Sequence, residues 1–290
     1  MTDTLLVTGA AGQLGRLVLD FLLARTSPGA PKIIATTRDV AKLADYAKRG
    51  VDVRAANFDE PASLPAAFAG ATRALIISTD AVGTRVAGHK AAIAALAKAG
   101  VKHIVYTSVP NPHGSLAGVA DDHEQTENAI IATGLDHTIL RNSLYIDLSL
   151  GAFKGAISTG KLVDAKGDSR LAWVTREDCA RTAAAALASG SGKTILDVTG
   201  PDALSGDDLA KLLSDVSGKP VQHISVPPAA LIDGLVGHGL PKPFAELLAS
   251  FDAATVKGDY AKTAPTVQQL SGVAPTSVKA WLAANRAALA

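Results

Sequence analysis

Hydrophobic and polar positions form a repeating block pattern along the first half of the chain. Short, continuous apolar runs are typical of strands buried on both faces of a parallel sheet, and the Ala- and Leu-rich runs between them are typical of helices. We predict strands at Leu5–Thr8, Lys32–Thr36, Val51–Ala55, Ala74–Ser78, His103–Thr107 and Thr138–Leu140. We predict helices at Leu14–Arg25, Ala41–Arg49, Ala62–Phe68, Arg85–Ala99 and Asp121–Thr133. The repeated strand–helix unit predicts an α/β, Rossmann-type, doubly wound parallel sheet.

The pattern is less regular after about residue 145, where glycines separate shorter segments. There we predict helices at Glu177–Ala188, Asp207–Ser217, Phe244–Lys257 and Val278–Ala288, and strands at Thr194–Thr199 and Val221–Val226. The sequence therefore predicts two units, a sheet domain at residues 1–145 and a smaller α+β lobe at residues 146–290. We expect the lobe to lie over the mouth of the sheet, to bind the substrate, and not necessarily to fold by itself.

Composition narrows the class of protein. The chain has 290 residues, 48% of them hydrophobic, and a net charge of +1, which is too balanced for a dedicated nucleic-acid binder. The apolar runs are shorter than the ~20 residues that span a bilayer, and the chain starts without a signal-peptide pattern. A single cysteine, Cys179, excludes an internal disulfide framework. We therefore expect a cytoplasmic protein with a small-molecule partner, without nucleic acid or membrane, and with a homodimer left open.

A glycine-rich turn, Gly9-Ala10-Ala11-Gly12-Gln13-Leu14-Gly15, follows the first predicted strand and opens the first predicted helix. In that context one glycine makes the tight turn, a second lets the backbone approach a pyrophosphate, and a third lets helix and strand pack closely. The helix N-terminus then offers unpaired N–H groups to the phosphates. The turn predicts a dinucleotide site, with the spacing G-x-x-G-x-x-G.

The end of the second predicted strand indicates which dinucleotide binds. NAD sites usually place an acid there for the ribose 2′-hydroxyl, but this strand ends Thr36-Thr37-Arg38-Asp39. A planar guanidinium at Arg38 suits a 2′-phosphate, whereas Asp39 is better placed to cap the next helix. We therefore predict NADP(H) in preference to NAD.

Several common catalytic patterns are absent from the sequence. None of the four tyrosines is followed by lysine at the fourth position, so the Tyr-x-x-x-Lys pair of the usual short-chain dehydrogenases is missing. The same absence weakens a nucleotide-sugar epimerase. There is no G-x-S-x-G elbow, no P-loop, and no histidine pairing that would indicate a metal site.

The sequence resembles the NmrA-like atypical short-chain dehydrogenases, and within them the bacterial branch of NAD(P)H:quinone oxidoreductases and triphenylmethane reductases. The segments that carry the resemblance are Val7–Arg16, Thr37–Asp39, Gly100–Ser108, Asp122–Glu127, Leu140–Tyr145 and Ser214–Lys219. The resemblance implies an NADPH-preferring reductase with a Rossmann domain and a C-terminal substrate lobe. The loop at Val109–Gly114 differs from the family pattern, which leaves the substrate open.

The resemblance also implies a set of site residues. The cofactor would contact Thr8, Gly9, Gly12, Gln13, Leu14, Gly15, Arg38, Phe58, Ser78, Thr79, Tyr106, Thr107, Ser108 and Asn142. His123 falls near the catalytic lysine of related isoflavone-type reductases, and Asn142 and Tyr145 would lie beside the nicotinamide and the substrate. We therefore assign catalytic roles to His123, Asn142 and Tyr145, with His123 or Tyr145 as the proton donor to the product.

Our functional hypothesis is an NADPH-dependent reductase that passes hydride to a flat, electron-poor acceptor such as a quinone. Such an acceptor needs little proton assistance before hydride addition, which fits a site without Tyr-x-x-x-Lys. One alternative is a reductase of an activated C=C, C=N or C=O bond in a specialised pathway. Another is a non-catalytic NADP(H) redox sensor, because one fold serves many functions.

Overall fold

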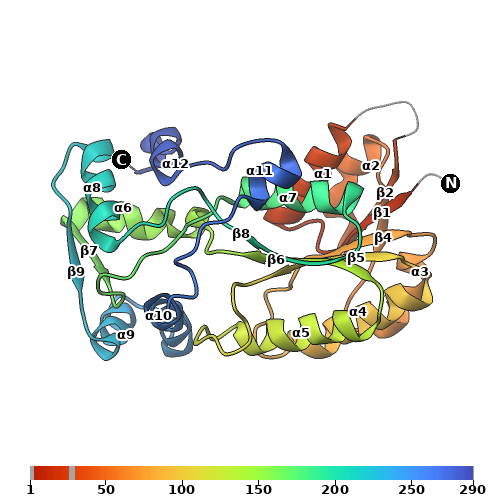
Figure 1. The fold of residues 1–290 in the computed structure, drawn as a ribbon, viewed down its shortest axis with the longest axis horizontal. Helices are drawn as coiled ribbons and strands as arrows, with labels where there is room; N and C mark the ends of the chain where they lie inside the picture. The colour runs from red at the N-terminus through yellow and green to blue at the C-terminus, as the bar shows by residue number, and fades with distance from the viewer. Residues whose placement is uncertain (1–2, 26–29, 290) are drawn as a thin grey trace.

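The fold is built around one parallel sheet (Figure 1), and the computed structural model describes residues 3–25 and 30–289. The seven strands lie in the order β3-β2-β1-β4-β5-β6-β8, and all neighbours are parallel. They are β1 (Thr4–Val7), β2 (Lys32–Thr37), β3 (Asp52–Ala55), β4 (Arg73–Ile76), β5 (His103–Ser108), β6 (Asp136–Asn142) and β8 (Lys193–Val198). The predicted Rossmann-type sheet is confirmed, and the strand order reverses between β1 and β4.

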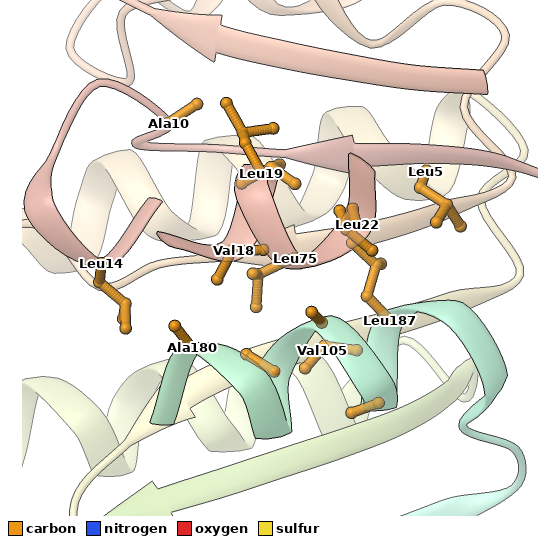
Figure 2. Packing of buried hydrophobic residues seen from close by; sticks show 14 of the residues in the cluster. Leu5, Ala10, Leu14, Val18, Leu19, Leu22, Leu75, Val105, Ala180 and Leu187 are labelled. Carbon is orange, nitrogen blue, oxygen red and sulfur yellow. The ribbon is translucent and has the colours of Figure 1, made fainter. Parts of the chain in front are cut away.

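Alternating side chains of each strand pack against helices on the two faces of the sheet. Leu5 and Val7 join the core under α1 (Gln13–Leu23) and α7 (Arg176–Ser189), whereas Leu6 joins the core on the opposite face. Figure 2 shows α1 and α7 packed together, with the small side chain of Ala180 allowing the close approach. The opposite face is covered by α3 (Leu64–Phe68), α4 (Arg85–Lys98) and α5 (Ala120–Ala132).

The smaller lobe has its own two-stranded parallel sheet, β7 (Lys161–Asp164) paired with β9 (Gln222–Ser225). Its core includes Ile146, Phe153, Leu213 and Trp281. The helices of this half are α6 (Leu150–Thr159), α8 (Gly206–Ser217), α9 (Pro228–Gly237), α10 (Lys242–Val256), α12 (Val278–Ala284) and α13 (Arg286–Leu289). Across the described ranges, no helix combines the length and hydropathy needed to cross a membrane.

Some elements of the second half lie with the main sheet. The strand β8 pairs with β6, α7 covers the sheet face beside α1, and α11 (Thr266–Ser271) packs on α7. The alanine-rich side of α7 explains this position, because it buries a nearly continuous apolar surface. The chain therefore returns to the sheet after passing through the lobe.

Besides the short helix at residues 146–149, four elements were not predicted from the sequence: α6, β7, α9 and α11. Gly151 and Gly155 interrupt the apolar pattern of α6, but a side chain at either position would face open space, so the helix tolerates them. Helix α9 follows Pro227 and begins at Pro228, where a fixed φ angle suits the first helical turn. The predicted helix Val278–Ala288 is divided into α12 and α13. The remaining short helices are η1 (Val40–Leu43), α2 (Ala44–Lys48), η2 (Pro61–Ser63) and η3 (Ile146–Ser149).

Candidate functional site

The glycine-rich turn connects β1 to α1 at the carboxyl end of the sheet, next to the point where the strand order reverses. Gly9 has a φ of +61°, a conformation that suits glycine, and the Ala10 N–H donates to Thr36 O at 3.1 Å. A Cβ at Gly15 would lie 2.5 Å from Gly9 O, so only glycine allows this approach of helix and turn. Thr8 is fully buried and its hydroxyl accepts from the Ile77 N–H at 3.2 Å, which ties the turn to β4.

The N-terminus of α1 is open and suits an anion. Gly12 is its N-cap, without a side-chain cap, and the first N–H groups of a helix have no intrahelical partner. Gly12 and Gln13 are exposed, whereas Leu14 turns its side chain into the core. These features fit a phosphate held by the backbone N–H groups of the turn and by the helix dipole.

Arg38 and Asp39 follow β2 and differ in what they contact. Asp39 Oδ1 accepts from the Ala41 N–H at 3.1 Å, so the aspartate caps η1, as predicted. Arg38 is exposed, and it makes no ion pair or side-chain hydrogen bond to any described residue. The Arg38 guanidinium at the end of β2 is thus available for a phosphate, whereas the Asp39 carboxylate is engaged in capping η1.

Ser78, Thr79 and Thr107 lie at the carboxyl ends of β4 and β5, close to one another. The Thr107 hydroxyl accepts from the Ser78 N–H at 3.0 Å, which joins the two strand ends. Ser78 and Thr79 are half-buried, so part of their surface faces the edge of the sheet. Phe58 is also half-buried, and its ring meets the His89 ring edge-to-face with centroids 6.1 Å apart.

Tyr106 and Ser108 point from β5 toward α5 and are engaged inside the protein. Tyr106 has no exposed surface. In this arrangement a cofactor could not touch it, and it supports the site from inside the protein. Its hydroxyl is 2.8 Å from His123 Nδ1, and burial raises the pKa of Tyr106 to about 12. The Ser108 hydroxyl donates to Glu127 Oε1 at 2.6 Å, and Arg141 donates to both carboxylate oxygens of Glu127.

His123 lies on α5 and is nearly buried. Burial, and next the nearby Arg85 guanidinium, lower the pKa of His123 well below the usual range of histidine. The imidazole is therefore neutral at neutral pH and cannot act as an imidazolium acid there.

Asn142 and Tyr145 are brought together at the end of β6. Asn142 Nδ2 donates to Tyr145 Oη at 2.8 Å, while Asn142 Oδ1 is buried without a hydrogen-bond partner among the described residues. Burial raises the pKa of the Tyr145 hydroxyl, which makes it a weak acid. An unpaired buried carbonyl oxygen is suited to an N–H donor of a ligand, such as a carboxamide.

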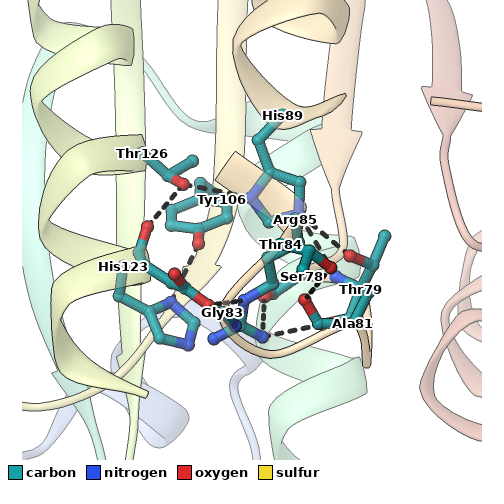
Figure 3. A network of polar contacts seen from close by, with 11 residues as sticks. Ser78, Thr79, Ala81, Gly83, Thr84, Arg85, His89, Tyr106, His123 and Thr126 are labelled. Atoms are coloured by element: carbon teal, nitrogen blue, oxygen red, sulfur yellow. Dashed lines mark hydrogen bonds and ion pairs between the residues drawn. The ribbon is translucent and has the colours of Figure 1, made fainter. Parts of the chain in front are cut away.

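The structure adds a polar network that the sequence analysis did not single out (Figure 3). Arg85 and Asp122 form a buried ion pair at 3.0 Å next to His123. His89 Nε2 accepts from the Thr79 N–H, so Nδ1 carries the proton and donates to Thr126 Oγ1 at 3.0 Å. The network escaped the sequence analysis because its members lie on separate elements, at spacings that match no motif.

Other cavities lie away from this edge of the sheet. A cavity of about 760 Å³ in the lobe is lined by charged residues such as Arg170, Asp208 and Lys211. Another of about 560 Å³ adjoins Thr4 and Lys32, at the amino ends of the strands. Parallel sheets bind ligands at their carboxyl ends, which favours the glycine turn over both. Within the part of the chain that the structure covers, no cluster of His, Cys, Asp or Glu could hold a metal ion.

Comparisons with known proteins show which family this chain is similar to. The model of the NmrA-like family matches residues 1–282. Quinone oxidoreductase 2 of Escherichia coli K12 is 34% identical over 94% of this chain and 95% of its own length. An NAD(P)H azoreductase of Xenophilus azovorans is 27% identical over 92% of this chain and 93% of its own length.

Solved structures extend the similarity to the whole fold. The NADPH-dependent quinone oxidoreductase of Escherichia coli, crystallised with NADPH, superposes with a TM-score of 0.92 at 33% identity, covering 97% of this chain and 99% of the other. The triphenylmethane reductase of a Citrobacter species, crystallised with NADP(H), superposes with a TM-score of 0.86 at 35% identity, covering 95% and 97%.

Proposed function

The chain belongs to the NmrA-like family, and from this premise we propose that it is an NADPH-dependent reductase of flat, electron-poor acceptors such as quinones. The observation that carries the proposal is the junction of β1, the glycine turn and α1, together with Arg38, to which no described residue forms an ion pair. Relatives of this chain that act on quinones, azo compounds and triphenylmethane dyes support the acceptor class.

The cofactor side of the proposal follows from charge. The Gly12 N–H already donates to Gly9 O at 3.0 Å, so the N–H groups of the first turn of α1, from Gln13 on, would bind the pyrophosphate. Arg38 would bind the 2′-phosphate. From β1 the sheet continues through β4 and β5 to β6, so the nicotinamide half would extend toward Asn142. When bound, NADPH supplies the hydride, and the protein supplies orientation.

The acceptor side involves His123, Asn142 and Tyr145, which we propose border the acceptor and the nicotinamide. Asn142 holds Tyr145 by its amide N–H and keeps its carbonyl oxygen free for a ligand N–H. Because His123 is neutral and the Tyr145 hydroxyl is a weak acid, we now propose that they orient the acceptor and that water protonates the product. A quinone permits this, since the anion formed on hydride addition is delocalised.

The test is oxidation of NADPH, followed by the absorbance of the reduced nicotinamide, with NADH in parallel. The acceptors are a panel of quinones, azo dyes, triphenylmethane dyes and activated alkenes. We expect turnover with quinones and a preference for NADPH. Arg38→Ala should remove about tenfold or more of the NADPH preference, because a charge-assisted bidentate contact contributes roughly 1.5–3 kcal/mol. Lys48→Ala, an exposed cation on α2, is the matched control and should change nothing.

The same assay separates the alternatives. Turnover with activated C=C, C=N or C=O substrates alone would replace the quinone by that acceptor class. Binding of NADPH without turnover on any acceptor would refute a reductase of this panel and favour a redox sensor. An Arg38→Ala variant with unchanged NADPH preference would refute the assigned phosphate contact.

The proposal also includes where the acceptor enters, where in the cell the protein works and its oligomeric state. We propose that the acceptor is a small molecule that enters between the sheet domain and the lobe. The predicted division at residue 145 then needs one change, because α7, β8 and α11 from residues 146–290 lie with the sheet. We also propose a cytoplasmic location, in keeping with the balanced charge of the chain. Size-exclusion chromatography with light scattering would distinguish a monomer from a homodimer.

A further inference from the structure

Arg85 stands at the start of α4, and its guanidinium joins the loop before α4 to α5 (Figure 3). Its Nε donates to Asp122 Oδ2 at 3.0 Å, and its Nη1 donates to Ser78 Oγ at 2.9 Å and to Thr79 O at 2.7 Å. Asp122 Oδ2 also accepts from the Gly83 N–H at 2.7 Å. The pair therefore fixes the loop between β4 and α4 against α5. This loop follows β4, the strand next to β1 and its glycine turn.

The Arg85–Asp122 pair is buried, and one nitrogen of the guanidinium has no hydrogen-bond partner among the described residues. The two side chains are 5% and 10% exposed. Arg85 Nη2 is buried and has no hydrogen-bond partner in the described part of the chain. A buried donor left without a partner is destabilising, and such a group in a native structure calls for a reason. In a low-dielectric interior its positive charge also acts strongly on its neighbours.

His123 is the titratable group next to this charge. Its Nδ1 is bonded to Tyr106, and no described residue bonds its Nε2. Burial is the first cause of the lowered pKa of His123, Arg85 is the second, and His89 acts in the same direction. The charged and titratable groups near the imidazole are Tyr106 on β5, Arg85 and His89 on α4, and Asp122 and Glu127 on α5. Both acids are already engaged, Asp122 by Arg85 and Glu127 by Arg141, so neither is free to pair with a protonated His123.

We propose that Arg85 is a positioning residue of this site, which holds the β4–α4 loop as one wall of the cofactor crevice and sets a buried positive charge beside His123. The inference rests on the proposed function, which places His123 next to the acceptor. The imidazole then serves the acceptor as a neutral hydrogen-bonding group through Nε2. The guanidinium favours the negative charge that develops on an acceptor as it takes up a hydride.

The charge is tested by following the imidazole C–H signals in NMR spectra against pH, with His123→Gln assigning the signal of His123. In the parent protein we expect His123 to titrate well below the usual range of histidine, because burial and the Arg85 guanidinium lower its pKa. In Arg85→Met its titration should move up toward the usual range of histidine, because the variant removes the nearby cation that lowers the pKa of His123. Arg85→Lys keeps a positive charge and should leave His123 neutral. Lys90→Met removes an exposed cation of the same helix and should match the parent.

The positioning role is tested by the Kd of NADP⁺, measured by calorimetry on the same variants. Both Arg85→Met and Arg85→Lys should weaken binding about tenfold, since each loses the fork that holds Ser78, Thr79 and Asp122 together. Lys90→Met should bind as the parent does. If Arg85→Lys also binds NADP⁺ more weakly, the loss of affinity comes from the geometry of the guanidinium and not from its charge, because lysine keeps the charge.

Several outcomes would overturn the inference. A folded Arg85→Met variant in which His123 titrates at the same pH as in the parent protein would disprove the effect of the charge. An Arg85→Lys variant that binds NADP⁺ as tightly as the parent would disprove the positioning role, and this variant decides if Arg85→Met does not fold. The titration needs no turnover. A protein that reduces no quinone, yet shows the shift of His123 in Arg85→Met, would lose the proposed function and keep this role of Arg85.

Discussion

Substituting alanine for Gly15 tests the tight contact between α1 and the glycine turn. A Cβ there would lie 2.5 Å from Gly9 O and 2.7 Å from Ala10 Cα. Both are backbone atoms, so relief requires movement of the turn itself. Such overpacking typically costs about 1–3 kcal/mol, and it outweighs the roughly 0.5–1 kcal/mol that alanine gains over glycine inside a helix.

Gly155 in α6 supplies a matched control. It lies inside a helix, it is exposed, and a Cβ there would meet no atom within 4 Å. Gly155→Ala should therefore stabilise the protein by about 0.5–1 kcal/mol. Gly15→Ala should destabilise it by about 1–2 kcal/mol after the helix gain is included. The same chemical change thus has opposite signs at the two positions.

The assay is urea unfolding followed by circular dichroism, with the free energy of unfolding compared among parent, Gly15→Ala and Gly155→Ala. The Kd of NADPH is measured in parallel. Because the turn must shift, Gly15→Ala should weaken NADPH binding about tenfold or more, and Gly155→Ala should not. A Gly15→Ala protein as stable as Gly155→Ala, with the parental affinity for NADPH, would refute the packing argument.

Three further predictions concern buried polar groups. Arg73→Met should lower the free energy of unfolding by about 1–3 kcal/mol in urea titrations, because its guanidinium donates to carbonyl oxygens at and just beyond the end of α7; an unchanged midpoint would contradict this. Glu127→Gln should cost about 3–5 kcal/mol, since it leaves Arg141 unpaired beside a buried site, whereas the more exposed Glu124→Gln should stay within about 0.5 kcal/mol; equal effects would disprove the difference. Burial lowers the pKa of both His89 and His103 to about 4, so the unfolded chain binds more protons below the ordinary value of 6.5. The free energy of unfolding should therefore fall from pH 6.5 toward pH 4, by up to about 1.4 kcal/mol per pH unit for each histidine, and a flat profile would contradict buried neutral imidazoles.

Local sequence patterns were sufficient for most of the sheet. Continuous apolar runs such as Ile33–Ala35 match strands covered on both faces, and the strand–glycine–helix order at Gly9–Gly15 predicted the turn. The role of Asp39 as the cap of η1 also follows from short-range chemistry. Helix α6 was missed because glycine weakens a helical pattern even where packing around Phe153 and Ile157 stabilises the helix.

The site was only partly predictable, because burial and protonation depend on neighbours distant in sequence. His123, Asn142 and Tyr145 were singled out, but the sequence does not indicate that Tyr106 holds His123 Nδ1 or that Asn142 holds the Tyr145 hydroxyl. Their protonation follows from that burial. The protonation states of His123 and Tyr145 change the proposed roles of these two residues from proton donors to orienting groups.

The amino-acid sequence by itself determined the class of fold and the glycine turn after the first strand, since both follow from patterns read along the chain. It also predicted a 2′-phosphate contact at Arg38, which stays a prediction. Tertiary structure alone decided that Arg85 and Asp122 meet between α4 and α5. It also decided that α7 and β8 return to complete the sheet. The physical reason is that desolvation and pairing of charges arise from packing between elements, and no local pattern records which elements will pack.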